Sequence, residues 1–148
     1  MGKQKNTSIK KKTNKNSWLV LGGIVIIAFA VLIGFQLDNN VTSDLPLEVS
    51  VSDAYKIREE GAFVLDVRQP EEWEAVHIPG ATLIPLGELE SRLDEVPQDQ
   101  NILVVCRSGN RSARARDILL TAGFQNVSSM AGGMNEWVAK SYDIGAGP

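Results

Sequence analysis

The sequence predicts an α/β domain with a mainly parallel central sheet flanked by helices, and two observations carry this prediction. From residue 49 onward, short apolar runs of strand length alternate with segments of helical periodicity, the order typical of βαβ units. The run Ile102-Leu103-Val104-Val105 has no polar alternation, as expected for a strand buried on both faces of a parallel sheet. About 100 residues remain in this part, enough for one compact core.

The first predicted helix begins at a cap on Ser52 and runs through Arg58, with Gly61 ending the segment. A strand is expected over 63–67, where the sequence reads Phe-Val-Leu-Asp-Val, and a shorter one over 81–84. The spacing of three leucines then predicts a helix over 86–93.

The clearest helix covers 111–122, because apolar residues recur there at i, i+3, i+4 and i+7 from Ala115. Gly123 follows as a C-terminal stop. A brief strand is expected to end at Val127. After a glycine pair, the chain has a last predicted helix over 134–140.

The net charge of −3 conceals an uneven distribution of charged residues along the 148-residue chain. Residues 1–17 carry six lysines and no acidic side chain, whereas the remaining residues hold 9 basic and 18 acidic side chains. Because the basic cluster is a tail and not a patch on a folded face, a nucleic-acid partner is not expected.

An apolar segment at 18–35, WLVLGGIVIIAFAVLIGF, contains no charged side chain. As a helix it would be roughly 27 Å long, close to the thickness of a bilayer's hydrocarbon core. It is predicted to be a transmembrane signal anchor, followed by a linker over 36–47. The lysines of 1–17 favour a cytoplasmic N-terminal tail, which places the later domain outside the cytoplasm as part of a single-pass membrane protein.

A cleaved signal peptide is the alternative, and it would release a secreted domain. Ala28-Phe29-Ala30 supplies the small-residue cleavage pattern that such a peptide needs. Five further apolar residues, Val31 to Phe35, extend the run beyond that site to spanning length, which favours the uncleaved anchor.

Cys106 is the single cysteine, which excludes an internal disulfide, a CxxC redox pair and a cysteine-based zinc site. It stands at the carboxyl end of the predicted central strand, where ligands bind in open α/β sheets. The turn formers Ser108, Gly109 and Asn110 follow it and allow the chain to curl around the sulfur with its N–H groups pointing inward.

Two arginines, Arg107 and Arg111, add positive charge near this sulfur, and the predicted helix start adds its dipole. Each effect favours thiolate over thiol, so a lowered pKa is predicted for Cys106. A lone cysteine is often a small buried hydrophobe. That interpretation explains the cysteine but not the arginines and turn formers after it.

A cysteine-dependent phosphatase is the first function that this loop suggests. Such a loop needs an arginine six positions after the cysteine to bind phosphate. Ser112 occupies that position here, and Arg111 stands five positions after Cys106. The loop is one residue short, which favours a pocket sized for a sulfur atom over one sized for phosphate.

The loop Cys106-Arg107-Ser108-Gly109-Asn110-Arg111-Ser112 resembles the active-site loop of single-domain rhodaneses, the thiosulfate-type sulfurtransferases. Two further stretches resemble the same family: FVLDVRQPEEWEAVHIPGA over 63–81 and GFQNVSSMAGGMNEW over 123–137. The resemblance delimits a rhodanese-like domain over 48–141, followed by a C-terminal tail over 142–148.

This resemblance implies a two-step sulfur transfer. The Cys106 thiolate would take the outer sulfur of a small anionic donor such as thiosulfate and become a persulfide, and cyanide or a thiol would then remove that sulfur. Backbone N–H groups from Arg107 to Arg111 would cradle the persulfide, while either arginine could draw in the donor or fold away to brace the loop. A protein acceptor, and a rhodanese-like binding or relay module with little small-molecule turnover, remain open; no metal or nucleotide cofactor is expected.

Several other residues are interpreted as structural. Asp66 and Arg68 are expected to pair between strand and loop, and His77 to make a structural hydrogen bond. Trp73 and Trp137 are expected to be core aromatics. The remaining acidic residues of this stretch are read as a solvated helical face: Glu71, Glu72 and Glu74. A thiol redox role is disfavoured, because no second cysteine could resolve an oxidised Cys106.

Overall fold

The computed structural model describes residues 45–148, so the predicted membrane span at 18–35 lies outside the described residues. Among residues 45–148, no helix is both long and apolar enough to cross a membrane.

A five-stranded sheet, parallel throughout, runs through the domain in the order β1-β5-β4-β2-β3. The strands are β1 (Glu48–Val49), β2 (Phe63–Asp66), β3 (Thr82–Leu83), β4 (Ile102–Val105) and β5 (Val127–Met130). Every residue of β4 is buried, which confirms the prediction of a central strand covered on both faces. Asp66 pairs with Val105 in register, so the carboxyl ends of β2 and β4 lie side by side.

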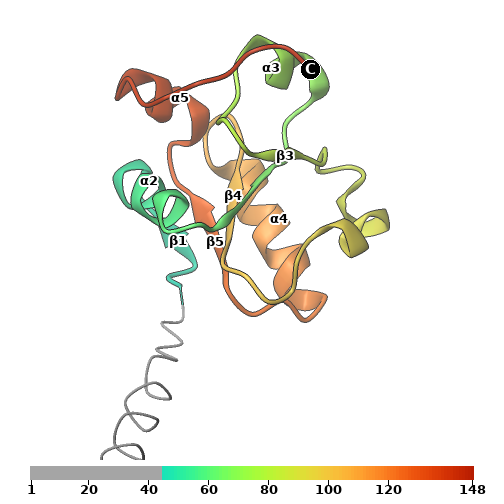
Figure 1. Ribbon diagram of the computed structural model, residues 1–148. Helices are drawn as coiled ribbons and strands as arrows, with labels where there is room; N and C mark the ends of the chain where they lie inside the picture. The colour runs from blue at the N-terminus through green and yellow to red at the C-terminus, as the bar shows by residue number, and fades with distance from the viewer. Residues whose placement is uncertain (1–44) are drawn as a thin grey trace, which may run out of the picture. The chain divides into compact units, whose positions relative to one another are not determined.

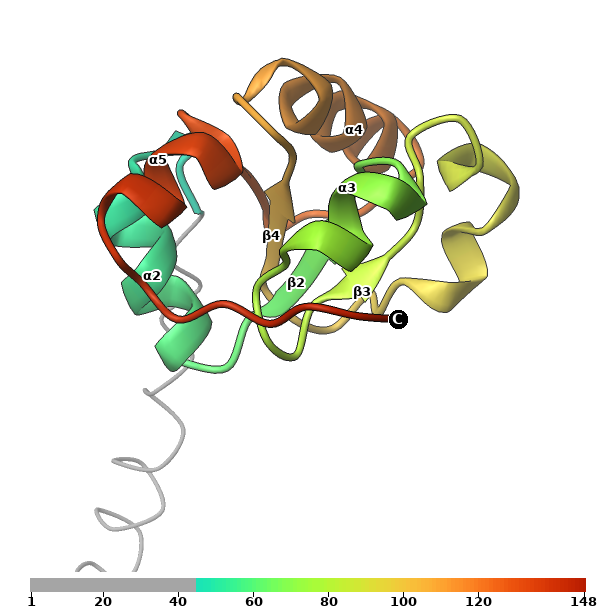
Figure 2. The same ribbon diagram turned by 90° about the horizontal axis from the view of Figure 1, so that it is seen from above.

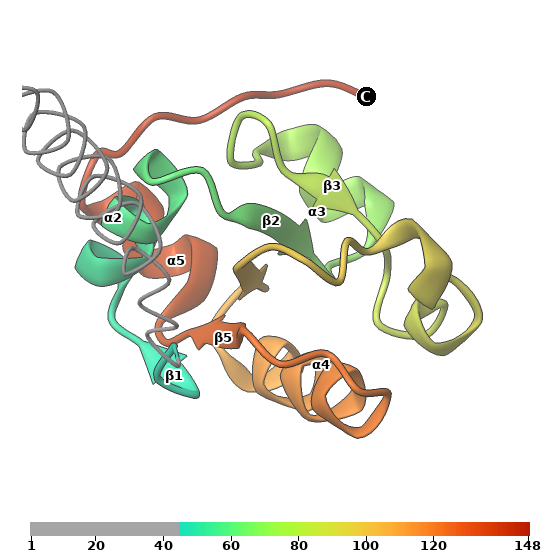
Figure 3. The same cartoon turned by 60° about the horizontal axis from the view of Figure 1, so that its bottom comes forward.

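Helices cover both faces of this sheet (Figures 1 and 3). They are α2 (Val51–Glu59), α3 (Pro70–Ala75), α4 (Asn110–Thr121) and α5 (Gly133–Ala139). Successive strand residues point to opposite faces, so Leu103 packs with α2 and α5, whereas Val104 packs with α4. Trp137, fully buried in α5, confirms one of the two predicted core aromatics.

Two predicted helices differ from the observed ones. The cap of α2 is Ser50 and not Ser52, because the Ser50 hydroxyl accepts the Asp53 N–H at 3.2 Å. The leucine-rich stretch at 86–93 does not form an α-helix. It contributes to two short 3₁₀ turns, Leu89–Ser91 and Leu93–Glu95, held by i to i+3 hydrogen bonds.

The last strand begins at Val127, where the sequence predicted that it would end. Its polar residues, Ser128 and Ser129, are fully buried. Their hydroxyls donate to the carbonyls of Pro46 and Leu47, at the start of the described chain. Side chains that bond to backbone allow this polar stretch to form a buried strand.

The segment at 142–148 is bound to the domain through several contacts (Figure 2). His77 and Gly145 exchange backbone hydrogen bonds at 2.9 and 2.8 Å. The Trp137 indole N–H donates to the Asp143 carbonyl at 2.9 Å, and Arg58 of α2 forms two hydrogen bonds with the Asp143 carboxylate. We call this segment the C-terminal strap.

Candidate active site

Cys106 follows β4 directly and is buried, with 1% of its surface exposed. Gly109, three residues later, has a φ of +103°, a conformation that side chains other than glycine rarely adopt. This conformation turns the Gly109 N–H toward the sulfur, to which it donates at 3.1 Å. The prediction that the loop curls around Cys106 is therefore confirmed at this residue.

Ser112 lies in the first turn of α4, fully buried, with its Oγ 3.6 Å from the Cys106 sulfur. Its hydroxyl also donates to the Gly109 carbonyl at 2.8 Å. Burial raises the pKa of the Cys106 thiol, but hydrogen bonding with the Ser112 side chain and with the backbone of Ser112, Ser108 and Gly109 outweighs it. The net result is a lowered pKa, in the predicted direction.

Two carbonyls of the loop accept hydrogen bonds from the first turn of α5. The Met134 N–H donates to the Cys106 carbonyl at 2.8 Å, and the Asn135 N–H donates to the Arg107 carbonyl at 3.0 Å. Gly133 permits this approach, because a Cβ there would lie 2.4 Å from the Cys106 oxygen. With its carbonyls occupied by α5, the loop keeps N–H groups available to the sulfur.

The two predicted loop arginines have different surroundings. Arg111 donates to both carboxylate oxygens of Glu72 in α3, at 2.7 and 2.8 Å. It braces the loop, one of the two roles that the sequence left open. Arg107 is exposed and forms no ion pair with any residue from 45 to 148. The other predicted loop residues, Ser108 and Asn110, are also exposed.

Glu72 was interpreted from the sequence as part of a solvated face, and this is wrong. Hydrogen bonds from Arg111, and one from the Gln69 N–H, hold the pKa of Glu72 at about 2, although burial opposes them. The carboxylate is 28% exposed and lies between α3 and the start of α4.

Asp66 and Arg68 form the predicted ion pair after β2, with both side chains almost fully buried. The Arg68 guanidinium donates to the Asp66 carboxylate at 2.6 to 2.9 Å. It also donates to the carbonyls of Glu72 and Val76, at the middle and end of α3. This pair therefore fixes α3 beside the cysteine loop.

His77 makes the structural hydrogen bond that was expected, since its Nδ1 lies 3.0 Å from the Trp73 carbonyl. Its ring stacks on Trp73, with centroids 3.9 Å apart and planes inclined by 6°. Trp73 is half-buried in this stack and is not a core aromatic. Within 45–148, no group of three or more His, Cys, Asp or Glu side chains gathers as a metal site would require.

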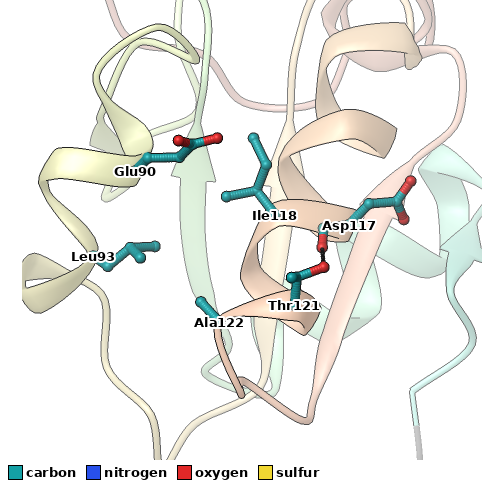
Figure 4. Close-up of a pocket in the computed structure, with 6 residues that line it drawn as sticks. All are labelled: Glu90, Leu93, Asp117, Ile118, Thr121 and Ala122. Carbon is teal, nitrogen blue, oxygen red and sulfur yellow. Dashed lines mark hydrogen bonds between the residues drawn. The ribbon is translucent and has the colours of Figure 1, made fainter.

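A cleft of about 380 Å³ adjoins the cysteine loop between α3 and α5. It is lined by the loop residue Arg107, by the charged side chains Arg68 and Glu72, and by apolar and polar residues of the two helices: Val76, Met134, Asn135 and Val138. We call it the α3–α5 cleft. A larger cavity of about 570 Å³ lies at the opposite end of α4, away from Cys106, among Leu93, Asp117 and Ala122 (Figure 4).

The matching family model is the rhodanese-like domain, and it covers residues 50–140, more than half of the chain. The chain belongs to the rhodanese-like family. It is 39% identical over 111 residues to the "Putative sulfur carrier protein YrkF" of Bacillus subtilis, covering 73% of this chain and 59% of that protein. It is 31% identical over 117 residues to the uncharacterized protein YqhL of the same organism, covering 79% of this chain and 93% of YqhL.

Solved structures share this rhodanese-like fold. A rhodanese-related protein from Thermoplasma volcanium superposes with a TM-score of 0.63 at 30% identity, covering 68% of this chain and 98% of its own. The reduced Bacillus anthracis protein CoADR-RHD superposes with a TM-score of 0.57 at 34% identity, covering 70% of this chain and 18% of its own. These matches confirm the predicted α/β fold with a parallel sheet.

The roles of two residues at this site of the rhodanese-like domain were not predicted from the sequence. Glu72 carried a local signal, because an acidic residue three positions after a helix cap commonly returns to the cap backbone. Ser112 carried another, since it falls on the same helix face as the buried Ala115 and Leu119. A polar residue on a core-facing stripe needs a partner, and here the partners are the sulfur and Gly109.

Proposed function

We propose that this rhodanese-like domain is a sulfurtransferase in which Cys106 carries sulfane sulfur as a persulfide. The thiolate attacks the outer sulfur of a donor such as thiosulfate, the S–S bond breaks, and sulfite leaves with the electron pair. Cyanide or a thiolate then attacks the outer sulfur of the persulfide, which restores the Cys106 thiolate. Because each step exchanges one sulfur anion for another, the site needs N–H donors at the sulfur more than a general base.

The hydrogen bond from the Gly109 N–H to the Cys106 sulfur, at 3.1 Å, is the observation that carries the proposal. A backbone donor at this place stabilises the thiolate, and the same donor can stabilise a persulfide anion. The names of two relatives support the proposal: YrkF, as quoted above, and the "Probable adenylyltransferase/sulfurtransferase MoeZ" of Mycobacterium tuberculosis, 41% identical over 76 residues.

Intact mass spectrometry of the full chain, mixed with thiosulfate in mild detergent, tests this function. We expect a species heavier by about 32 Da, one sulfur atom, that cyanide removes. The Cys106→Ser variant, which keeps the size of the side chain, should show no such species. Absence of the adduct in the wild-type chain would exclude transfer from thiosulfate.

A rhodanese-like relay module that passes sulfur to a protein partner is the second candidate. It is favoured by the relative named as a sulfur carrier and by the 1% exposure of Cys106. This candidate predicts that small donors load Cys106 slowly, whereas a persulfide-bearing partner protein loads it rapidly.

The proposal also includes a location. Residues 18–35 anchor the chain in a membrane with residues 1–17 in the cytoplasm, and the apolar length and lysine distribution support this. Protease added to spheroplasts that express the chain should then digest the domain and leave the anchor in the membrane fraction. A released chain that begins after Ala30 would instead establish the secreted alternative.

A further inference from the structure

The charges around the cysteine loop are almost entirely compensated. Arg68 is paired with Asp66, and Arg111 with Glu72. Arg107, exposed at the edge of the α3–α5 cleft, is the one arginine lining this cleft that has no acidic partner among residues 45–148. A bound anion therefore meets one uncompensated positive side chain here, beside the carboxylate of Glu72.

Apolar side chains form much of the remaining cleft wall. Val76 follows α3, while Met134 and Val138 belong to α5. Val138 is 45% exposed, unusually so for a large hydrophobic side chain in this domain. Met134 is also the residue whose N–H binds the Cys106 carbonyl, so this wall begins at the cysteine loop itself.

We infer that the α3–α5 cleft selects sulfur donors with a single negative charge and an apolar substituent, such as organic thiosulfonates or hydropersulfides, over the inorganic dianion thiosulfate. This inference rests on the proposed sulfurtransferase function and specifies its substrate class. One charge is matched by Arg107, and the substituent covers apolar surface that a small dianion leaves in water. A second negative charge would meet no further unpaired cation among the residues that line this cleft, because Arg68 is paired with Asp66.

Glu72 is on this view a specificity-determining residue, which acts through Arg111. Its carboxylate keeps the guanidinium of Arg111 occupied by two hydrogen bonds. Arg111 also borders a neighbouring cleft of about 480 Å³ that contains Arg114, so the ion pair stands between the two clefts. Removing the carboxylate would release a second cation for a dianionic donor.

The transfer step is the same for each donor compared. With benzenethiosulfonate, the Cys106 thiolate attacks the terminal sulfur, the S–S bond breaks, and benzenesulfinate leaves with the electron pair. One negative charge then resides on the persulfide and one on the sulfinate, so charge and atoms balance. Thiosulfate, methanethiosulfonate and benzenethiosulfonate thus differ in charge and substituent while donating the same sulfur atom.

The experiment measures the rate of Cys106 persulfidation in the full chain with these three donors. Each rate is divided by the donor's rate with N-acetylcysteine, which removes differences in intrinsic reactivity. We expect benzenethiosulfonate to exceed thiosulfate by about tenfold, with methanethiosulfonate between them. In Glu72→Gln the thiosulfate rate should rise about fivefold relative to benzenethiosulfonate. The matched control is Glu74→Gln, on the same helix, where the ratio should stay within twofold.

A second variant keeps the inference falsifiable if Glu72→Gln disturbs the loop. Val138→Asn makes the apolar wall polar, and it should lower the ratio of benzenethiosulfonate to thiosulfate rates about threefold. Leu47→Asn, at an exposed apolar residue beside β1, is its control and should not change the ratio. Equal normalised rates for all three donors, unchanged in both cleft variants, would overturn the inference and leave the sulfurtransferase function intact. Absence of any persulfide would overturn both.

Discussion

Two neighbouring segments, one after β2 and one after β4, leave the same edge of the sheet and are held by different forces. After β2, a buried pair of charged side chains, Asp66 and Arg68, fixes the chain. After β4, the loop is fixed by backbone hydrogen bonds from α5 and by the conformation of Gly109. The first arrangement gives rigidity through side chains. The second aims the Gly109 N–H at the sulfur and leaves the side chains of Arg107, Ser108 and Asn110 exposed.

The largest change in the free energy of unfolding is expected from breaking the buried Asp66–Arg68 pair after β2. Asp66→Asn leaves the Arg68 guanidinium buried without a counter-charge, so we expect a loss of about 3–5 kcal/mol in the free energy of unfolding. Urea unfolding followed by tryptophan fluorescence measures it. Asp53→Asn, which breaks the exposed pair with Lys56, is the control and should shift the midpoint far less. Comparable shifts of the unfolding midpoint in Asp66→Asn and Asp53→Asn would show that burial of an ion pair does not determine how much its loss destabilises the domain.

A single methyl group at Gly133 should disrupt the backbone hydrogen bonds between the cysteine loop and α5. Gly133→Ala places a Cβ against the backbone of Cys106, Arg107 and Ser108 at a φ of +58°, and we expect a loss of about 2–4 kcal/mol. Gly123→Ala also lies at a positive φ, +97°, but a Cβ there would have no atom within 4 Å. It therefore carries the conformational strain alone, about 1–2 kcal/mol. Thermal unfolding compares the two, and an equal loss in both would argue against close approach at Gly133.

A smaller change should alter the chemistry while leaving the loop in place. Ser112→Ala removes a hydrogen bond that lowers the pKa of Cys106, so the pKa should rise and the thiolate should appear at higher pH. The rate of iodoacetamide alkylation against pH reports this midpoint. Ser108→Ala retains its backbone N–H and should leave the midpoint unchanged. A midpoint that is unaffected in Ser112→Ala would mean that backbone groups alone stabilise the thiolate.

The smallest effect concerns the partly buried pair of Glu72 and Arg111. Because the pKa of Glu72 is about 2 in the folded chain and 4.5 in its ordinary range, its stabilisation is complete above pH 4.5 and is lost as the pH falls to 2. Solvent screening limits it to about 1 kcal/mol. The unfolding free energies of wild type and Glu72→Gln should therefore differ near pH 7 and converge near pH 2. If the two unfolding free energies differed by the same amount from pH 7 to pH 2, the ionised Glu72 carboxylate would not be the source of this stabilisation.

The sequence was sufficient for features that depend on local pattern. The unbroken apolar run at 102–105 located β4, and the cysteine followed by turn formers located the loop. The extent of β5 was missed because Ser128 and Ser129 look exposed in sequence, while their burial depends on carbonyls 82 residues away. The pairing of Glu72 with Arg111 spans 39 residues, and no local periodicity encodes it.

The C-terminal strap has a consequence for where this module can be divided. The family match ends at residue 140, yet the strap beyond it binds Arg58, His77 and Trp137. A chain ended at residue 140 would keep all five strands and the cysteine loop, but the Trp137 indole N–H would lose the Asp143 carbonyl and the Arg58 guanidinium would lose the Asp143 carboxylate. The folded unit of this chain therefore extends beyond the residues that the family model matches, and a transplanted domain should extend to Gly147, whose N–H donates to the Glu74 carbonyl.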